Sequence, residues 1–167
     1  MRTLCKSAFT ALAIAGLLSA CGDGGDDDDP APTAINASVG VSAAGDAALN
    51  GTYSSNTIAL SEVDKVNPIG GDPETCRFRF SGLQQAGTSR LMDGDIRYIP
   101  GTNELRTTFV SIAGTEFRLQ GTANAAVDHT NNEVDYTGAT LVSTQGTGQT
   151  ITLTGSIPML GGRPEGC

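Results

Sequence analysis

His129 is the only histidine of the chain, so a Ser-His-Asp relay would have to use it. It stands in the run Asp-His-Thr-Asn-Asn at positions 128–132, a composition typical of a turn between two strands. A nucleophile elbow of the form Gly-x-Ser-x-Gly does not occur in the sequence. We therefore expect His129 to be a solvent-exposed turn residue, and we predict a protein that is not an enzyme and has no catalytic residue.

Acidic residues gather at two places where an ion could bind. One group surrounds the same turn, and the second is Asp93-Gly94-Asp95. The oxygen-bearing residues of the first group are Asp128, Asn131, Asn132, Glu133 and Asp135. Neither group has the Asp-x-Asp-x-Asp-Gly spacing and trailing Glu of a calcium loop, and acidic turns are common without an ion. The sequence favours no metal and no cofactor, with calcium as the alternative.

Arg77 and Arg79 stand two residues apart in an alternating segment, which places both on one face of a strand. A pair of this kind can bind an anion, but the outward positions of an amphipathic strand usually carry solvated charges. We favour solvent-facing charges. No pair of facing carboxylates that would suit a glycosidase stands out.

The charge balance limits the partners of the protein. The formal net charge is −8, and residues 30–167 carry 13 acidic and 8 basic residues. Such a chain repels phosphate backbones and anionic lipid surfaces on average, so we predict no nucleic-acid partner.

The first 21 residues have the organisation of a secretory signal. Arg2 and Lys6 precede an apolar run at residues 8–18, which is too short to span a bilayer as a helix. The run ends in Leu-Ser-Ala-Cys at positions 18–21. This ending resembles the lipobox of bacterial lipoprotein precursors.

The resemblance implies a diacylglyceryl thioether on Cys21, cleavage just before it, and acylation, for example with palmitate, of the new N-terminus. An ordinary secretory signal is the alternative. Gly22 follows Cys21, where an Asp would resemble an inner-membrane retention signal. We therefore expect a lipid-anchored protein of the cell envelope, on the outer membrane, whose domain lies in the periplasm or at the cell surface.

Two further cysteines, Cys76 and Cys167, remain after Cys5 leaves with the signal and Cys21 takes up lipid. An even pair in an oxidising compartment predicts a disulfide between them. The alternatives are two free thiols and an intermolecular bond. The predicted bond would hold down a glycine-rich C-terminal tail.

The elements that must position these residues are all strands. Apolar and polar residues alternate from residue 49 onward, and no window keeps a helical period. We predict strands near 51–60, 75–83, 89–99, 104–112, 116–128, 132–143 and 149–157. The apolar faces of the two longest are Phe117, Leu119, Gly121, Ala123, Ala125 and Val127, and Val134, Tyr136, Gly138, Thr140 and Val142.

Short connections from residue 89 onward predict an all-β, antiparallel meander of about seven strands that forms a small curved barrel or sandwich. The predicted organisation is a signal peptide at 1–20, the lipidated cysteine with a flexible acidic tether at 21–48, and one β domain at 49–167. An additional edge strand near residues 35–41 is a weaker expectation.

Two functions follow from this organisation. The first is a non-enzymatic envelope lipoprotein whose β domain binds a protein or a glycan. The second is a carrier that encloses a small apolar ligand inside the barrel. Its inner face would include Phe78, Phe80, Tyr98, Phe117 and Leu119.

Overall fold

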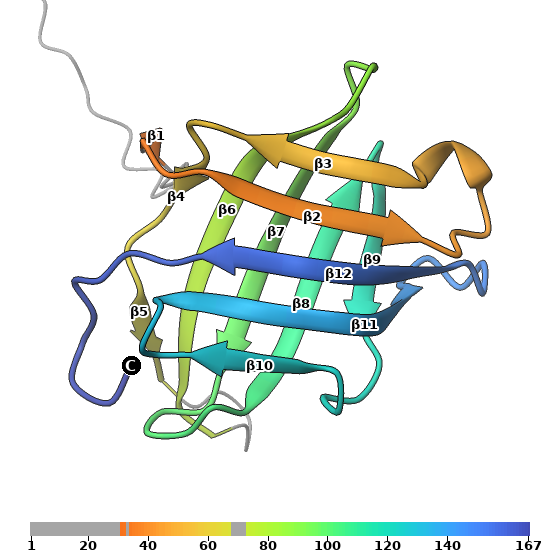
Figure 1. Cartoon of the computed structure of the whole chain (residues 1–167). Helices are drawn as coiled ribbons and strands as arrows, with labels where there is room; N and C mark the ends of the chain where they lie inside the picture. Colours follow the sequence, from red (N-terminus) through yellow and green to blue (C-terminus); the bar gives the residue numbers. More distant parts are fainter. Residues whose placement is uncertain (1–30, 33, 68–72) are drawn as a thin grey trace, which may run out of the picture.

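The computed structural model describes residues 31–32, 34–67 and 73–167 as one antiparallel sheet with a single short 3-10 helix (Figure 1). The elements are β1 (Ala31–Pro32), β2 (Ala37–Ser42), η1 (Ala47–Leu49), β3 (Gly51–Ser55), β4 (Ala59–Leu60), β5 (Asp64–Val66), β6 (Thr75–Gln85), β7 (Leu91–Tyr98), β8 (Leu105–Ile112), β9 (Thr115–Leu119), β10 (Ala125–Asp128), β11 (Glu133–Ser143) and β12 (Thr150–Pro158).

Eight of these strands close into a barrel in the order β2-β3-β6-β7-β8-β9-β11-β12, because β12 pairs with β2 and β6 pairs with β7. The orange and blue strands β2, β3, β11 and β12 cross in front of the green strands β6 and β7 (Figure 1). The predicted all-β, antiparallel fold is therefore confirmed, and of its two predicted forms, barrel and sandwich, the structure is a barrel. Four small strands add to this wall: β4 and β5 pair with β6, β1 pairs with β4, and β10 pairs with β11.

The predicted edge strand near residues 35–41 is β2, and it lies inside the wall. It pairs with β12 on one side and with β3 on the other. The folded unit therefore includes residues that the sequence placed in the tether. Cys21, the signal region and the run of aspartates lie outside the described residues.

The long strand predicted at residues 116–128 is wrong in its middle. β9 ends at Leu119 and β10 begins at Ala125, and both pair with β11. Gly121 adopts a φ of +68°, outside the range of an extended strand, and Ala123 is exposed. The two segments share one place in the wall, and Gly121 and Ala123 do not face the interior.

A second correction concerns the inner face of β11. Its register with β12 shifts between Thr137 and Ala139, where Gly138 has a φ of +82°. A bulge of this kind exchanges the two faces of the strand beyond it. Val134 and Tyr136 face inward as predicted, but after the bulge Ala139, Leu141 and Ser143 take the buried positions in place of Thr140 and Val142.

The interior of the barrel is filled by large apolar side chains that form one continuous core. The largest fully buried members include Tyr53, Tyr98, Tyr136, Phe78, Phe80 and Phe117. Each tyrosine hydroxyl has a partner: Tyr53 donates to the carbonyl of Leu49 at 3.0 Å, Tyr98 donates to that of Cys167 at 2.8 Å, and Tyr136 bonds to Thr108 at 2.9 Å. These hydrogen bonds offset the cost of burying the hydroxyl groups.

Opposite ends of the barrel are covered by different segments. The chain leaving β2 forms η1, which places Leu49 in the core. Since β12 runs antiparallel to β2, the chain leaving β12 covers the other end, where Met159 and Cys167 are buried. There the predicted disulfide between Cys76 and Cys167 is present, with a Cα–Cα distance of 5.7 Å.

Candidate functional site

His129 is not the solvated turn residue that the sequence predicted. Its Nε2 lies 2.9 Å from the carbonyl oxygen of Thr102, and its Nδ1 lies 3.1 Å from Nη1 of Arg163. The ring also meets Tyr98 edge to face, with the ring centroids 5.8 Å apart. His129 therefore ties the β10–β11 turn to the β7–β8 turn and to the C-terminal segment. Both ring nitrogens are engaged in this structural contact.

The acidic group at the same turn comes together as its spacing suggested. Carboxylate oxygens of Asp128, Glu133 and Asp135 lie within 4.8 Å of one another. Asp128 already accepts hydrogen bonds from the backbone amides of Thr130 and Asn131 and from the Asn131 side chain.

These surroundings shift the pKa of two members of the group, Asp128 and Asp135. The Asn131 backbone hydrogen bond is the largest cause that lowers the pKa of Asp128. Burial, followed by the charges of Glu133 and Asp128, raises the pKa of Asp135. The Asp128 carboxylate thus stabilises its own turn through these hydrogen bonds.

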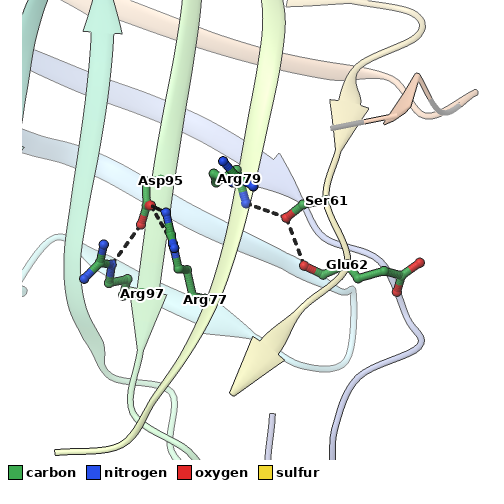
Figure 2. Close-up of polar contacts among 6 residues, drawn as sticks. All are labelled: Ser61, Glu62, Arg77, Arg79, Asp95 and Arg97. Atoms are coloured by element: carbon green, nitrogen blue, oxygen red, sulfur yellow. Dashed lines mark hydrogen bonds and ion pairs between the residues drawn. The ribbon is translucent and has the colours of Figure 1, made fainter. Parts of the chain in front are cut away.

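The second predicted acidic cluster is divided between two roles. Asp93 accepts a hydrogen bond from the backbone amide of Gly82 at 3.0 Å. Asp95 accepts from Arg77 Nε at 2.7 Å and from Arg97 Nε at 3.0 Å, and Figure 2 shows its carboxylate between the two guanidinium groups. Asp93 and Asp95 therefore make separate contacts, one with a backbone amide and the other with two arginines.

Arg77 and Arg79 face outward from β6, as the alternation predicted, and both are half-buried rather than freely solvated. Arg77 pairs with Asp95 on the neighbouring strand β7. The backbone amide of Arg79 donates to Ser61 Oγ, which itself donates to the carbonyl of Glu62 (Figure 2). This face of the wall is thus a network of charges and hydrogen bonds.

We call the outward side of these four adjacent strands the β6–β9 face. It holds five of the eight basic residues that follow residue 30, against three acidic residues. The basic residues are Arg77, Arg79, Arg97, Arg106 and Arg118, and the acidic ones are Asp93, Asp95 and Glu116. The outward positions of β2 and β12, across the barrel, carry no charged side chain. An acidic protein therefore presents one locally basic wall.

The β6–β9 face contains a cleft of about 260 Å³, which we call the Thr107 cleft. A register shift opposite Arg97 and Tyr98 leaves Arg106 as an extra residue on β8, so Arg106 and Thr107 both turn outward. Arg97 is the cross-strand partner of Thr107, and Arg118 is that of Phe109.

These neighbours make up most of the cleft. Its lining includes Pro73, Arg97, Arg106, Thr107, Phe109 and Arg118. Arg118 lies over the ring of Phe109, with its guanidinium carbon 5.7 Å from the ring centroid. The arrangement offers cationic hydrogen-bond donors above an aromatic surface.

The sequence analysis did not find this cleft, because it singled out only the two arginines of one strand. Arg97 and Arg118 alternate with buried neighbours, so their outward direction could have been predicted. Their meeting with Arg106 depends on strand pairing and on the bulge, which the local pattern does not reveal.

Three further hollows of the described surface also lie outside the core, and they measure about 340–500 Å³. In the described part of the chain, no helix has the length and apolar character needed to cross a bilayer. Comparisons with known protein families, with curated proteins and with solved structures gave no match.

Proposed function

We propose that the protein is a lipid-anchored, non-enzymatic component of the bacterial cell envelope whose barrel binds an anionic envelope glycan on its β6–β9 face. The observation that carries this proposal is the concentration of five arginines on one wall of an otherwise acidic barrel. A locally basic surface attracts an anionic partner even when the protein as a whole is acidic.

The packed interior favours binding on the outside over transport of an apolar cargo. An eight-stranded barrel is just wide enough for its own side chains to fill, and here tyrosine and phenylalanine side chains occupy the centre. Segments of the chain also cover both ends. A carrier would have to expel part of this core to admit a ligand.

A glycan fits this surface better than a protein does. The cores of protein interfaces are usually apolar and aromatic. Among the described residues, Leu91 is the one large hydrophobic side chain that is exposed, at 48%. The β6–β9 face instead offers guanidinium groups beside a cleft whose lining is partly polar, and such groups suit anionic and hydroxylated ligands.

The anchor follows from the Leu-Ser-Ala-Cys ending at Cys21, and the tether between Cys21 and the barrel would hold the β6–β9 face within reach of the envelope. The absence of Asp after Cys21 favours the outer membrane. The attachment itself would come from acyl chains, since no basic patch lies near the predicted anchor.

The anchor is tested by expressing the full chain in a bacterium with an outer membrane and supplying labelled palmitate. The wild-type protein is expected to incorporate the label and to fractionate with the outer membrane, whereas Cys21→Ala should lose both properties. Equal labelling and equal membrane association of Cys21→Ala would contradict lipidation at this residue.

The binding surface is tested with the mature lipoprotein in detergent micelles and with lipopolysaccharide or peptidoglycan from the same host. Arg118→Glu should weaken binding, and higher salt should weaken it further. The control is Ser38→Glu/Thr154→Glu, which makes the same change in net charge at exposed positions of β2 and β12. Equal loss in both variants, or capture of an envelope protein with no glycan, would refute the proposal.

A further inference from the structure

Phe109 is the exception among the phenylalanine and tyrosine residues of the described chain. The other six are buried in the core, namely Tyr53, Phe78, Phe80, Tyr98, Phe117 and Tyr136. Phe109 instead holds an outward position of β8 and is only half-buried. An aromatic ring at such a position leaves apolar surface in contact with water, so the hydrophobic effect favours a ligand that covers it.

Phe109 lies between two hollows of the β6–β9 face. It lines the Thr107 cleft, and it also lines a second hollow of about 400 Å³, which we call the Phe109 hollow. Arg118, whose guanidinium carbon lies 5.7 Å from the ring centroid, lines the Thr107 cleft and does not line the Phe109 hollow. A ligand in the Phe109 hollow therefore meets the aromatic side chain away from the Arg118 contact.

Strand pairing places a row of polar side chains beside Phe109 in this hollow. Asp93, Ser111 and Glu116 are cross-strand neighbours on β7, β8 and β9, one outward position along from Phe109. Directly paired residues stand about 5 Å apart, so the two acidic residues flank a space of about 10 Å above the small Ser111 side chain. Within the described residues, Asp93 and Glu116 each accept one side-chain hydrogen bond through a single carboxylate oxygen, which leaves the second oxygen of each to a ligand.

The chemistry of the Phe109 hollow matches that of an uncharged sugar ring. The C–H groups of a pyranose form an apolar face that packs against an aromatic ring, while its hydroxyl groups donate to carboxylates and exchange hydrogen bonds with serine. The hollow is more apolar than the Thr107 cleft, and three carboxylates against one guanidinium line it, which disfavours an anionic group. A volume of about 400 Å³ also falls within the range of about 300–1,000 Å³ that is usual for small-molecule sites.

From these contacts we propose that the Phe109 hollow binds an uncharged sugar unit of the anionic envelope glycan, with the sugar ring stacked on Phe109. The inference rests on the proposed function and specifies a second element of the ligand on the same face. The basic cleft and the acidic hollow share Phe109 as their border. A glycan chain in which an uncharged sugar follows an acidic one therefore fits the two neighbouring sites in turn.

The test measures the affinity of the mature lipoprotein, in detergent micelles, for oligosaccharides released from the lipopolysaccharide and the peptidoglycan of the host. Phe109→Leu keeps an apolar side chain but removes the ring, and it should weaken binding about tenfold. This loss should be the same at low and high salt because the lost contact is uncharged, whereas the loss in Arg118→Glu should shrink as salt rises. The control is Leu91→Ala, which removes an exposed apolar side chain of the same face outside the hollow and should stay within about twofold of the wild type.

Ser111→Leu tests the hollow without changing Phe109 or any arginine. The larger side chain should fill the space between the two acidic residues and weaken binding at least tenfold. Thr154→Leu makes a similar change at an exposed position of β12, across the barrel, and should leave the affinity unchanged. In the wild-type complex, NMR should show nuclear Overhauser effects between the Phe109 ring protons and the C–H protons of an uncharged sugar.

The outcomes separate this inference from the proposed function. Wild-type affinity in Phe109→Leu or in Ser111→Leu, with binding still weakened in Arg118→Glu, would refute the sugar site and leave the proposed function standing. Overhauser effects from Phe109 only to an acidic sugar or to a peptide would overturn the sugar site as well. A wild-type protein that binds neither set of oligosaccharides would refute the proposed function and this inference with it.

Discussion

Removal of the Cys76–Cys167 disulfide should cost the barrel much of its stability. The bond joins residues 91 apart in the sequence, so it closes most of the folded chain into one loop. In the chain-entropy treatment, a loop of this length destabilises the unfolded state by about 4.6 kcal/mol at 25 °C. A domain of this size is typically stable by about 5–15 kcal/mol, so the loss is a large fraction of the total.

Without the disulfide the protein should still fold to the same structure, because other contacts hold the C-terminal segment in place. The amide of Gly101 donates to the carbonyl of Gly166 at 2.7 Å, and the hydroxyl of Tyr98 donates to the carbonyl of Cys167 at 2.8 Å. Arg163 reaches both His129 and Met159. Native spectra should therefore be retained while the unfolding midpoint falls.

The assay is urea denaturation of the mature protein followed by circular dichroism. Cys76→Ala, Cys167→Ala and the double variant should each lose about 4–5 kcal/mol, and the wild type in reducing agent should lose a similar amount. The three variants should agree because the two cysteines act as one unit, so their effects are not additive. A loss below about 1 kcal/mol, or a double variant that loses twice as much as either single one, would refute the reasoning.

Two further substitutions test the packing and the electrostatics of the wall. Gly94→Ala should destabilise the barrel by about 2–3 kcal/mol in the same denaturation assay. The new Cβ would lie 2.5 Å from Phe80 Cε1 and 2.6 Å from the carbonyl oxygen of Phe109, which is too close for either contact. An unchanged free energy of unfolding would show that the neighbouring strands can move apart at this position. Asp135→Asn should raise the free energy of unfolding at pH 7 by less than about 1 kcal/mol, because burial and two neighbouring carboxylates raise the pKa of Asp135 and so disfavour its charged form in the folded state. A carboxyl group whose pKa is raised in the folded state lowers the stability of the protein only at pH values where the group is ionised. Once the group is protonated in both the folded and the unfolded state, this cost is gone, so the gain from Asp135→Asn should disappear as the pH falls below the reference value of 3.8. A gain that persists at lower pH would contradict this cause.

Several strands could be predicted from the sequence because apolar and charged residues alternate sharply in them. In β6, Cys76, Phe78 and Phe80 are buried, and the arginines between them face outward. A charged residue on the inner face would carry a large desolvation cost, so such a segment has one acceptable register. The disulfide could be predicted for a different reason, since the predicted signal cleavage and lipidation left only Cys76 and Cys167 to pair.

The errors occur where side chains are small and alternation says little about burial. Gly121 and Ala123 continued the apparent pattern of β9, but neither contributes enough apolar surface to hold a strand against the wall. The sequence also did not reveal that β2 lies inside the barrel wall, because its partner β12 is more than a hundred residues away in the sequence. Gly138 was assigned an inner position in β11, whereas it forms the bulge that exchanges the two faces.

The candidate site could not be predicted from the sequence either, because it depends on a bulge in β8. In a regular β8, Arg106 and Thr107 would face opposite sides, and one of these polar side chains would enter the core. The extra residue at the shift opposite Arg97 and Tyr98 lets Leu105 and Thr108 keep their inward places while Arg106 and Thr107 both turn outward. The two outward residues then meet Arg97 and Arg118 from the neighbouring strands. One local irregularity therefore preserves the core and brings three arginines together on the outside of an acidic protein.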